Sequence, residues 1–273
     1  MKRNFFSICK LFLFSALALM SCQKETSLQS ATAESLTAIS SARPADRTNT
    51  FYGPQTQIAD GKARSFIIMS GEGIPQELGI EITSDAFSRL PVNGHSAFQL
   101  SLHQKAMDAT AFDHIVMNWN ANGHPPAVLF GVPHFDFHFF TISKEAQLAI
   151  PPYAPGSLHD LLPPNPYWPV GHIPLPGGEA EMGKHWADII RPVTPGNFTH
   201  TMIYGSYNGA MNFVEPMITR AYLLALTDKV SVPYNQPAVY TESDTWFPTV
   251  YNMYTNENRS KYYVTLSNFI ESQ

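Results

Sequence analysis

The sequence predicts an α+β domain in which an antiparallel β-sheet dominates, accompanied by a few short helices and a long proline-rich loop. Apolar and polar residues alternate over short runs such as Ala97–His103, which is typical of strands with one buried face. The dipeptides Asp60-Gly61 and Asn208-Gly209 lie between such runs, and both favour tight β-hairpin turns. Only 14% of the 273 residues are charged, whereas 22 are proline and 12% are aromatic, a composition that favours a loop-rich β domain over a helical bundle.

The N-terminal residues 1–21 resemble a lipoprotein signal peptide. A basic start at Lys2 and Arg3 precedes the apolar run Leu11–Leu19, which is shorter than the roughly 20 residues needed to span a bilayer. The run ends in Leu-Met-Ser-Cys, so we expect cleavage before Cys22 and lipidation of its thiol, which would anchor the chain to a membrane of the bacterial cell envelope. An ordinary cleaved signal peptide and a retained membrane anchor are the alternatives.

The remaining chain divides into a tether and one domain. Residues 22–47 contain the lipidated cysteine and a segment rich in Ser, Ala and Thr without aromatic residues, which predicts a flexible tether. A frayed helix over Thr32–Ser41 is the alternative for this segment. Residues 48–273 are predicted to form a single α+β domain.

Cysteine usage and charge exclude several classes of function. The chain has two cysteines, Cys9 and Cys22, so the mature domain has no thiol for a disulfide, for thiol catalysis or for a cysteine-based zinc site. Any transition metal ion must therefore be held by histidine and carboxylate side chains. The net charge is −5 and no basic run follows Arg3, so we expect no nucleic-acid partner.

The elements of the domain follow from periodicity, turn residues and helix caps. The expected strands are Thr50–Ile58 and Ala63–Met69 in one hairpin, Ala97–His103, Phe112–Trp119, Val132–Ile142, Phe198–Tyr204 and Ala210–Val214 in a second hairpin, and Thr249–Tyr254 and Tyr262–Leu266 in a third. The expected helices are Thr83–Phe87, Ser143–Leu148, Glu179–Asp188 and Met217–Leu226. Residues 151–178 hold so many prolines that they cannot lie inside a sheet, which predicts a long surface loop.

The strand predicted at Val132–Ile142 carries the strongest functional pattern. Successive side chains of a strand point to opposite faces. One face therefore receives His134, Asp136 and His138, and the other receives Phe135, Phe137 and Phe139. The phenylalanines indicate a buried core face, so the polar residues must face a cavity, a cleft or solvent.

These polar residues are candidate metal ligands. Same-face neighbours on a strand lie about 6.6 Å apart, so two of them reach one ion easily, whereas His134 and His138 together reach it only at the limit. Either the strand bends so that all three residues bind one ion, or only two of them bind it and the third, a histidine or Asp136, has another role. The candidate metal set is His134, Asp136, His138, His185 and Glu215, with Zn²⁺ or another divalent transition metal ion as the cofactor.

The supporting ligands come from other segments. His185 would lie on the predicted helix Glu179–Asp188, which would place Glu181, His185 and Asp188 on one face. Glu215 would lie at a junction between strand and helix, where it could instead cap the helix. His124 is a turn histidine close to the strand, while His95, His103, His114, His159, His172 and His200 are interpreted as structural. A polar pocket without metal and a plain hydrogen-bonded network are the alternatives to a metal site.

Several blocks of the chain resemble a bacterial family of exported domains of unknown function. The blocks are, in order, Gly123–Pro126, Val132–Phe140, Met182–Asp188 with its Gly183 and His185, Phe213–Thr219, Trp246–Tyr251, and Tyr263 with Phe269. The founder of this family is a thermophile protein controlled by an extracytoplasmic-stress sigma factor and its anti-sigma factor. The resemblance implies an exported α+β domain that forms a homo-oligomer and is rich in His, Asp and Glu within these blocks, without an established activity.

Two functions from different classes remain open. The first is a lipid-anchored, metal-dependent hydrolase or lyase of the envelope, in which Glu215 or Glu181 serves as a ligand or a base. The second is a non-catalytic envelope module, either a stress-related structural subunit or a binding protein for a small apolar or aromatic ligand. In this module Tyr153, Tyr167 and Trp168 would line a groove, or would instead pack within the loop to hold its shape.

Overall fold

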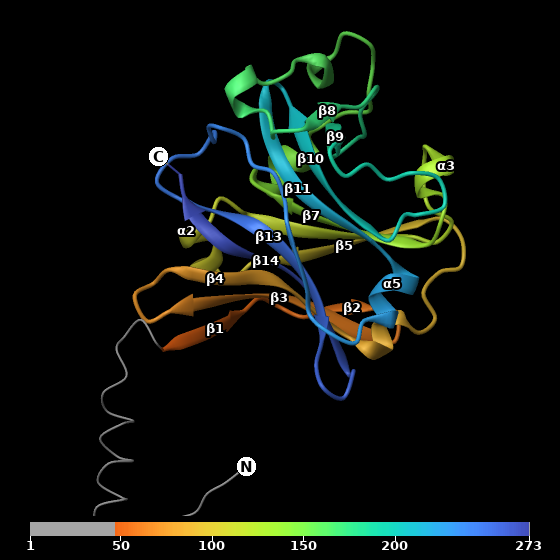
Figure 1. Cartoon of the computed structure of the whole chain (residues 1–273), viewed down its shortest axis with the longest axis vertical. Helices are drawn as coiled ribbons and strands as arrows, with labels where there is room; N and C mark the ends of the chain where they lie inside the picture. Colours follow the sequence, from red (N-terminus) through yellow and green to blue (C-terminus); the bar gives the residue numbers. More distant parts are fainter. Residues whose placement is uncertain (1–46, 273) are drawn as a thin grey trace, which may run out of the picture. The chain divides into compact units, whose positions relative to one another are not determined.

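The computed structural model describes residues 47–272, which form two seven-stranded antiparallel sheets that pack face to face (Figure 1). The prediction of a mainly antiparallel β domain with few short helices is confirmed, with two sheets where one was expected. The predicted signal peptide, the lipidated Cys22 and most of the tether lie outside the described residues.

The first sheet, sheet A, contains the N-terminal and C-terminal strands of the described chain. Its strands, in spatial order, are β1 (Thr48–Tyr52), β3 (Gly61–Ser70), β4 (Pro75–Thr83), β14 (Lys261–Glu271), β13 (Trp246–Thr255) and β12 (Val230–Pro233), and β2 (Thr56–Ile58) pairs with β3. The Asp60-Gly61 hairpin is confirmed, with Ile58 opposite Gly61. The single strand expected at Thr50–Ile58 is interrupted, because Gly53, Pro54 and Gln55 separate β1 from β2.

The second sheet, sheet B, carries the candidate site. Its strands, in spatial order, are β5 (His95–Ser101), β6 (His114–Asn120), β7 (His134–Phe140), β11 (Ala210–Thr219), β10 (His200–Tyr207), β9 (Lys184–Asp188) and β8 (His172–Pro174). The Asn208-Gly209 turn joins β10 to β11, as predicted, with Tyr207 opposite Ala210. β7 lies in the middle of this sheet, between β6 and β11, so both of its faces are covered.

The main hydrophobic core fills the space between the two sheets. Sheet A contributes aliphatic side chains such as Ile80 and Leu266, and sheet B contributes Phe135, Phe137 and Phe139 from β7. All five are at most 1% exposed. This burial agrees with the alternation in the sequence, because the phenylalanine face of β7 is the face that packs on sheet A.

A second, smaller apolar cluster covers the opposite face of sheet B. It contains Val116, Phe130, Phe140, Phe198, Ile203, Phe213 and Met217. Because this cluster lies over the polar face of β7, the polar side chains of that strand are buried and not solvated.

The helices within residues 47–272 are short and lie in connections between strands. They are η2 (Ser84–Phe87), α2 (Gln104–Ala109), α3 (Ala127–Phe130), α4 (Lys144–Leu148), η3 (Leu158–Asp160), η4 (Asn165–Tyr167) and α5 (Arg220–Ala225). The helix expected at Met217–Leu226 begins only at Arg220, because Met217–Thr219 continue strand β11 and Thr219 caps the helix with its side chain.

The helix predicted at Glu179–Asp188 is wrong. Lys184–Asp188 form strand β9, and the residues before it turn sharply, with positive φ angles of 61° at Glu181 and 111° at Gly183. A helix cannot pass through two such residues. The alternation of buried Lys184, Trp186 and Asp188 with half-buried His185 and Ala187 is the pattern of a strand.

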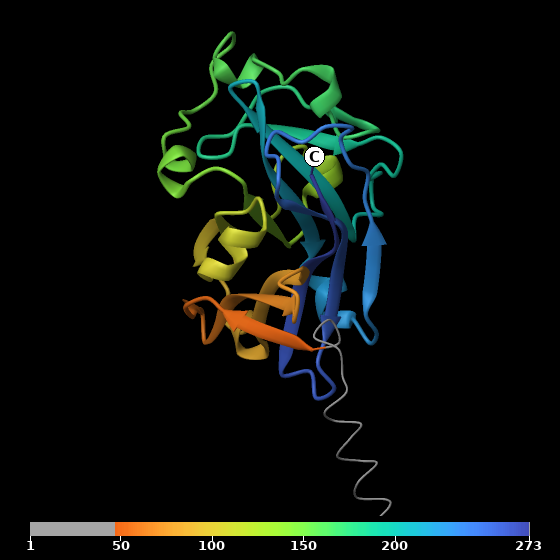
Figure 2. The same cartoon turned by 90° about the vertical axis from the view of Figure 1, so that its left-hand side faces the viewer.

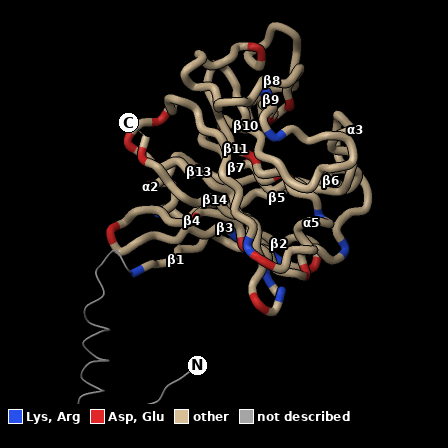
Figure 3. The backbone as a smooth tube through the Cα atoms, in the orientation of Figure 1, with Lys and Arg blue, Asp and Glu red and all other residues tan. Residues whose placement is uncertain are grey.

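The proline-rich residues 151–178 contain two short 3-10 helices, η3 and η4, and the edge strand β8. In both views this segment, drawn in green, lies at the end of the domain far from the orange strands β1 to β4 (Figure 2). No helix within residues 47–272 is long and apolar enough to cross a membrane. Lysine, arginine and acidic residues are scattered, many of them in turns and loops (Figure 3).

Candidate metal centre

The polar face of β7 is almost completely removed from water. His134, Asp136 and His138 are 0%, 5% and 1% exposed. Burial of three titratable side chains is unfavourable unless each has a hydrogen-bonding, ionic or metal partner. The neighbouring side chains therefore indicate which partners this face of the strand provides. The structure divides them between two groups of potential ligands.

The first group consists of His138, His185 and Glu215, from strands β7, β9 and β11. Glu215 stands opposite His138, because the pairs Val214–Phe139 and Met217–Asp136 bracket them on the two strands. The pairing of β7 with β11 is interrupted at Glu215 and Pro216, and proline has no N–H to donate to a neighbouring strand. His185 reaches the same place from β9, where it stands opposite Gly205 of β10.

The separations in this group suit a shared ion better than direct hydrogen bonds. His138 Nε2 lies 3.5 Å from Glu215 Oε1, and His185 Nε2 lies 3.6 Å from Glu215 Oε2. Hydrogen bonds between such atoms are about 2.7–3.2 Å long. Two ligand atoms that share a tetrahedral zinc ion at about 2.0–2.1 Å are separated by about 3.3–3.4 Å. Both ring nitrogens of His138 and Oε2 of Glu215 are buried without a hydrogen-bond partner among the described residues.

Burial also sets the protonation of this group. It lowers the pKa of His138 to about 3 and that of His185 to about 4, although the charge of Asp136 acts in the opposite direction on both. Burial, supported by the charge of Asp136, raises the pKa of Glu215 well above its usual value. Both imidazoles are therefore neutral near pH 7, which leaves nitrogen lone pairs available to a metal ion.

The second group consists of His124, His134 and Asp136. His134 Nε2 lies 3.2 Å from Asp136 Oδ1, and His124 Nε2 lies 3.6 Å from Asp136 Oδ2. The Nδ1 atoms of both histidines point at backbone carbonyls, those of Val132 and Pro125. Donation to these carbonyls places the proton of a neutral ring on Nδ1, so that both Nε2 atoms face the carboxylate with a lone pair or with a second proton.

The carboxylate of Asp136 is charged in this group. Burial alone would raise its pKa, but the hydrogen bonds and charges of His124 and His134 lower it well below its usual range. The pKa of His124 is raised, because the effect of burial is outweighed by its hydrogen bond and charge interaction with Asp136. His124 is also the most accessible member, with 34% of its side chain exposed. Without a metal ion, His124 and Asp136 therefore form a partly buried ion pair at pH values below the raised pKa of His124.

The single metal site predicted from sequence is thus two groups. His138, His185 and Glu215 converge, while His134 and Asp136 join the turn residue His124 in the other group. The turn is possible because Gly123 has a φ of +70°, and a side chain there would also overlap the backbone of Phe130. The pleat explains the division, because same-face neighbours on a strand are too far apart for one ion to collect all three residues of β7.

Two residues considered as partners of His185 lie elsewhere. Asp188 accepts hydrogen bonds from the backbone of Ile190 and Arg191 and forms an ion pair with Arg191. Glu181 is exposed in the turn before β9. Because the segment is a strand, the i, i+4 and i+7 spacing does not bring these carboxylates to His185.

Sequence reasoning missed three residues that support the second group. The side-chain amide of Asn120 donates to Asp136 Oδ2 at 2.6 Å, and its oxygen lies 2.8 Å from His95 Nδ1. Asn118 Nδ2 lies 3.0 Å from His95 Nε2. The signal was available, because Asn118 and Asn120 alternate with apolar residues on the strand just before His134, at the spacing of one strand face.

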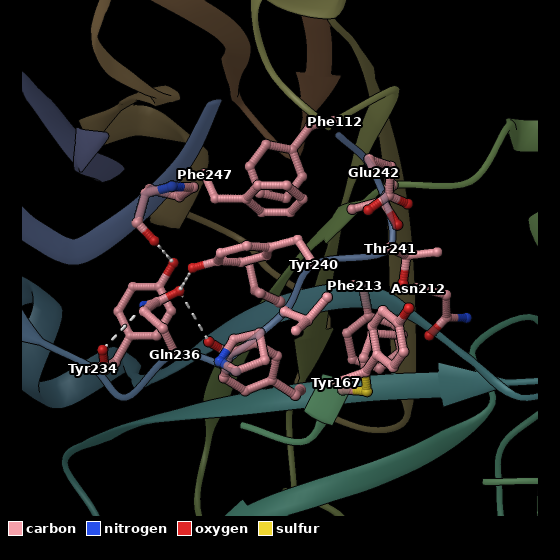
Figure 4. A pocket seen from close by; sticks show the side chains of 17 residues that line it. Phe112, Tyr167, Asn212, Phe213, Tyr234, Gln236, Tyr240, Thr241, Glu242 and Phe247 are labelled. Atoms are coloured by element: carbon pink, nitrogen blue, oxygen red, sulfur yellow. Dashed lines mark hydrogen bonds between the residues drawn. The ribbon is translucent and has the colours of Figure 1, made fainter. Parts of the chain in front are cut away.

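A small aromatic cavity is lined by none of the potential ligands, although Phe213 in its wall also packs on His138 and His185 (Figure 4). Its volume of about 30 Å³ suits about one or two water molecules and not an aromatic ligand. Of the three residues predicted to line a groove, Tyr167 borders this cavity, Trp168 packs on Trp186, and Tyr153 packs on His159. In Figure 4, Gln236 lies beside Tyr234 and Tyr240. Its NH₂ group donates to the backbone carbonyl of Tyr234, and its side-chain oxygen accepts from the hydroxyl of Tyr240.

Comparison of the chain with protein-family models, curated proteins and solved structures finds no match.

Proposed function

We propose that this protein is a lipid-anchored, metal-dependent enzyme of the bacterial cell envelope, with hydrolase or lyase chemistry at a centre formed by His138, His185 and Glu215. The observation that carries the proposal is the convergence of these three side chains. His138 Nε2 lies 3.5 Å from Glu215 Oε1 and His185 Nε2 lies 3.6 Å from Glu215 Oε2, separations that are too long for hydrogen bonds and close to those around a tetrahedral ion. Zn²⁺ is the favoured ion, because two neutral imidazoles and a carboxylate form a typical catalytic zinc set.

Three protein ligands leave one coordination position for water or substrate. Structural zinc sites are usually closed by four protein ligands, whereas catalytic sites keep an open position. A zinc ion there would lower the pKa of its bound water to about 7 and so supply a nucleophile at neutral pH. His185 is the ligand through which solvent comes nearest, since 20% of its side chain is exposed while those of His138 and Glu215 are at most 2% exposed.

The envelope location belongs to the same proposal. It is supported by the basic start, the short apolar run and the Leu-Met-Ser-Cys sequence that ends at Cys22. The order of the His, Asp and Glu blocks, which resembles that of an exported family, supports it independently and also favours a homo-oligomer.

Elemental analysis of the full chain, produced without a polyhistidine tag, tests metal binding. We expect at least one divalent transition metal ion per chain, and the loss of about one equivalent in His138→Phe. The matched control is His114→Phe, because His114 is also buried on sheet B and stacks on Phe140, as His138 does, but belongs to neither ligand group.

Two results would contradict metal binding. One is wild-type protein with far less than stoichiometric metal and no thermal shift on addition of Zn²⁺, Mn²⁺ or Cu²⁺. The other is a metal content that is the same in His138→Phe and in wild type. The first result would favour the non-catalytic module, in which the buried polar groups form a structural network.

The catalytic part of the proposal has its own test. Hydrolysis of a chromogenic ester such as p-nitrophenyl acetate should depend on the metal ion, disappear in His138→Phe and persist in His114→Phe. Hydrolysis that survives chelation, or that His114→Phe lowers as much as His138→Phe, would show that this centre is not responsible.

A further inference from the structure

The second ligand group brings three hydrogen-bond acceptors to one place. The Nδ1 atoms of His124 and His134 lie 2.8 and 2.7 Å from the backbone carbonyls of Pro125 and Val132, so a neutral ring carries its proton on Nδ1 and a lone pair on Nε2. Both Nε2 atoms face Asp136, and a charged carboxylate has lone pairs only. A cation between these atoms would satisfy all three side chains at once.

The separations suit an ion that lies between the ligand atoms. His134 Nε2 lies 3.2 Å from Asp136 Oδ1, His124 Nε2 lies 3.6 Å from Asp136 Oδ2, and one ligand atom from each residue lies within 4.8 Å of the other two. Ligand atoms of a tetrahedral zinc ion are about 3.3–3.4 Å apart. Asp136 Oδ1 is buried and has no donor in good hydrogen-bond geometry among the described residues. Because an ion occupies the space that its ligands enclose, it needs no cavity beside these buried atoms.

Hydrogen bonds from neighbouring strands hold the carboxylate in place. The side-chain NH₂ group of Asn120 donates to Asp136 Oδ2 at 2.6 Å, and the Asn120 oxygen lies 2.8 Å from His95 Nδ1. The same NH₂ group lies 3.4 Å from His134 Nε2, which is longer than a normal hydrogen bond and leaves that lone pair available. Metal-binding histidines and carboxylates are typically oriented by carbonyl and side-chain partners of this kind. Every ligand of the group therefore has such a partner.

His124 provides a path from solvent. Its side chain is 34% exposed, whereas that of His134 is fully buried. The His134 ring packs on Phe198 and Phe130, with centroids 5.3 and 6.5 Å away, and Phe130 also packs on His124. Apolar side chains around a metal ion limit the access of water to it. An ion therefore enters past His124, which lies in the connection between β6 and β7 and not on the strand that holds the other two ligands.

This group is separate from the proposed metal centre, because no residue belongs to both groups. Asp136 and His138 are same-face neighbours on β7, about 6.6 Å apart, whereas the two ions of a bridged two-metal site are about 3.5–4 Å apart. Ions in the two groups would therefore have separate ligands, and each could bind without the other.

We infer that His124, His134 and Asp136 bind a second divalent transition metal ion. The inference adds a site to the proposed centre and does not depend on that centre. Two imidazole nitrogens and a carboxylate suit Zn²⁺, which is the probe used below. Three protein ligands leave one coordination position for water.

Zinc binding by the full chain, produced without a polyhistidine tag and stripped of metal ions by chelation, tests the inference. Excess Zn²⁺ is added, unbound ion is removed, and the bound ion is measured by elemental analysis. We expect two Zn²⁺ ions per chain in wild type, and one each in His124→Phe and His138→Phe. The matched control is His103→Phe, which should keep both ions. His103 is also partly exposed and packs on Phe51, as His124 packs on Phe130, but it belongs to neither group.

The variants separate this inference from the proposed centre. A zinc content that is the same in His124→Phe and in wild type would overturn the inference, and so would wild-type protein without bound Zn²⁺. One ion per wild-type chain that is lost in His124→Phe and retained in His138→Phe would support the inference and contradict the proposed centre. One ion with the reverse behaviour would overturn the inference alone.

NMR of the wild-type protein locates the ion without any substitution. Spectra that correlate the ring protons with both nitrogens distinguish Nδ1 from Nε2 in each imidazole. Added Zn²⁺ should shift the Nε2 resonances of His124 and His134 and leave Nδ1 protonated in both, because each Nδ1 donates to a backbone carbonyl. Nε2 resonances of both histidines that do not shift in excess Zn²⁺ would overturn the inference.

Discussion

The Glu215 carboxylate lies between the buried imidazole of His138 and the half-buried imidazole of His185, and Glu215 itself is 1% exposed. Without a metal ion this position is unfavourable, because the charged form has neither solvent nor a close donor. In the proposed metal centre the same carboxylate would be a ligand. Binding of the ion would therefore change a single residue from a destabilising to a stabilising group.

Glu215→Gln should reveal this change through the pH dependence of stability. The pKa of Glu215 is raised in the folded protein, so the unfolded chain loses this proton at a lower pH than the folded chain does. The free energy of unfolding therefore falls as the pH rises above about 4.5, the usual pKa of the side chain. Each unit by which the folded pKa is raised lowers the free energy of unfolding by about 1.4 kcal/mol once the pH lies above both pKa values. The metal-free variant should therefore have the higher melting temperature at pH 8, with a difference that shrinks toward pH 4.5.

Added Zn²⁺ should reverse this order. Wild type gains stability by binding the ion to its native state, whereas the glutamine variant gains much less because it has lost a charged ligand. Thermal unfolding of both proteins at pH 8, with and without Zn²⁺, measures the effect. A variant that is less stable than wild type in both conditions would show that Glu215 has a structural partner.

His124 offers a second prediction, about the ligand group that includes Asp136. In the metal-free protein its pKa should lie above 6.5, because Asp136 stabilises the imidazolium against the effect of burial. Asp136→Asn should bring that pKa below 6.5, since burial then dominates. Histidine signals followed by NMR through a pH titration measure both values, and a pKa of His124 that is the same in both proteins would contradict the assignment.

Strand β10 contributes no ligand to the centre, but its Gly205 determines the position of the Phe213 ring that packs on two of the ligands. Gly205 stands opposite His185 on one side and Phe213 on the other, and a Cβ at this position would overlap the Phe213 ring. That ring packs on both imidazoles, with centroids 4.9 Å from His138 and 5.2 Å from His185. The glycine thus provides the space in which the aromatic ring supports the two ligands.

Gly205→Ala should therefore weaken both stability and metal binding. Overpacking of this kind costs about 1–3 kcal/mol, and displacement of Phe213 should lower Zn²⁺ affinity about tenfold or more by moving the imidazoles. Gly79→Ala is the matched control, because a Cβ there would overlap β14 in sheet A, remote from the centre. Denaturant unfolding and Zn²⁺ titration should show stability losses in both variants but an affinity loss only in Gly205→Ala. Equal affinities would contradict the supporting role of Phe213.

Some elements could be predicted from local sequence and others could not. The hairpins at Asp60-Gly61 and Asn208-Gly209 were predictable, because the turn residues themselves favour the conformation that the strands require. β9 was not, because the helical spacing of Glu181, His185 and Asp188 agreed with a short helix. The positive φ angles at Glu181 and Gly183 and the pairing with β10 determine the strand, and neither is visible in composition or periodicity.

At the scale of the whole molecule, the sandwich provides the centre with its surroundings. One face of sheet B packs on sheet A, and the other is covered by Phe130 and Phe198 from connecting segments. The site is thus buried within one sheet and its covering loops and does not lie between the two sheets. A substrate must therefore reach the site from the side covered by the connecting segments that contain Phe130 and Phe198.

The proposed lipid anchor gives the last prediction. Cys22→Ser in the full chain should move the protein from the membrane fraction to the soluble fraction and abolish incorporation of labelled palmitate, because it removes the thiol that we propose is lipidated. Cys9→Ser is the control and should leave both unchanged, since Cys9 precedes the expected cleavage site. Membrane association that persists in Cys22→Ser would favour a retained membrane anchor.

The sequence by itself determined that β7 is a strand, its division into aromatic and polar faces, and the exclusion of thiol ligands from residues 48–273. These properties are local, because the period of a strand and the number of cysteines do not depend on the rest of the fold. Only the tertiary structure decided which polar residues meet. Two same-face spacings of about 6.6 Å each, as in any extended strand, separate His134 from His138 by about 13 Å, and the order of β7, β11, β10 and β9 brings Glu215 and His185 to His138 across neighbouring strands.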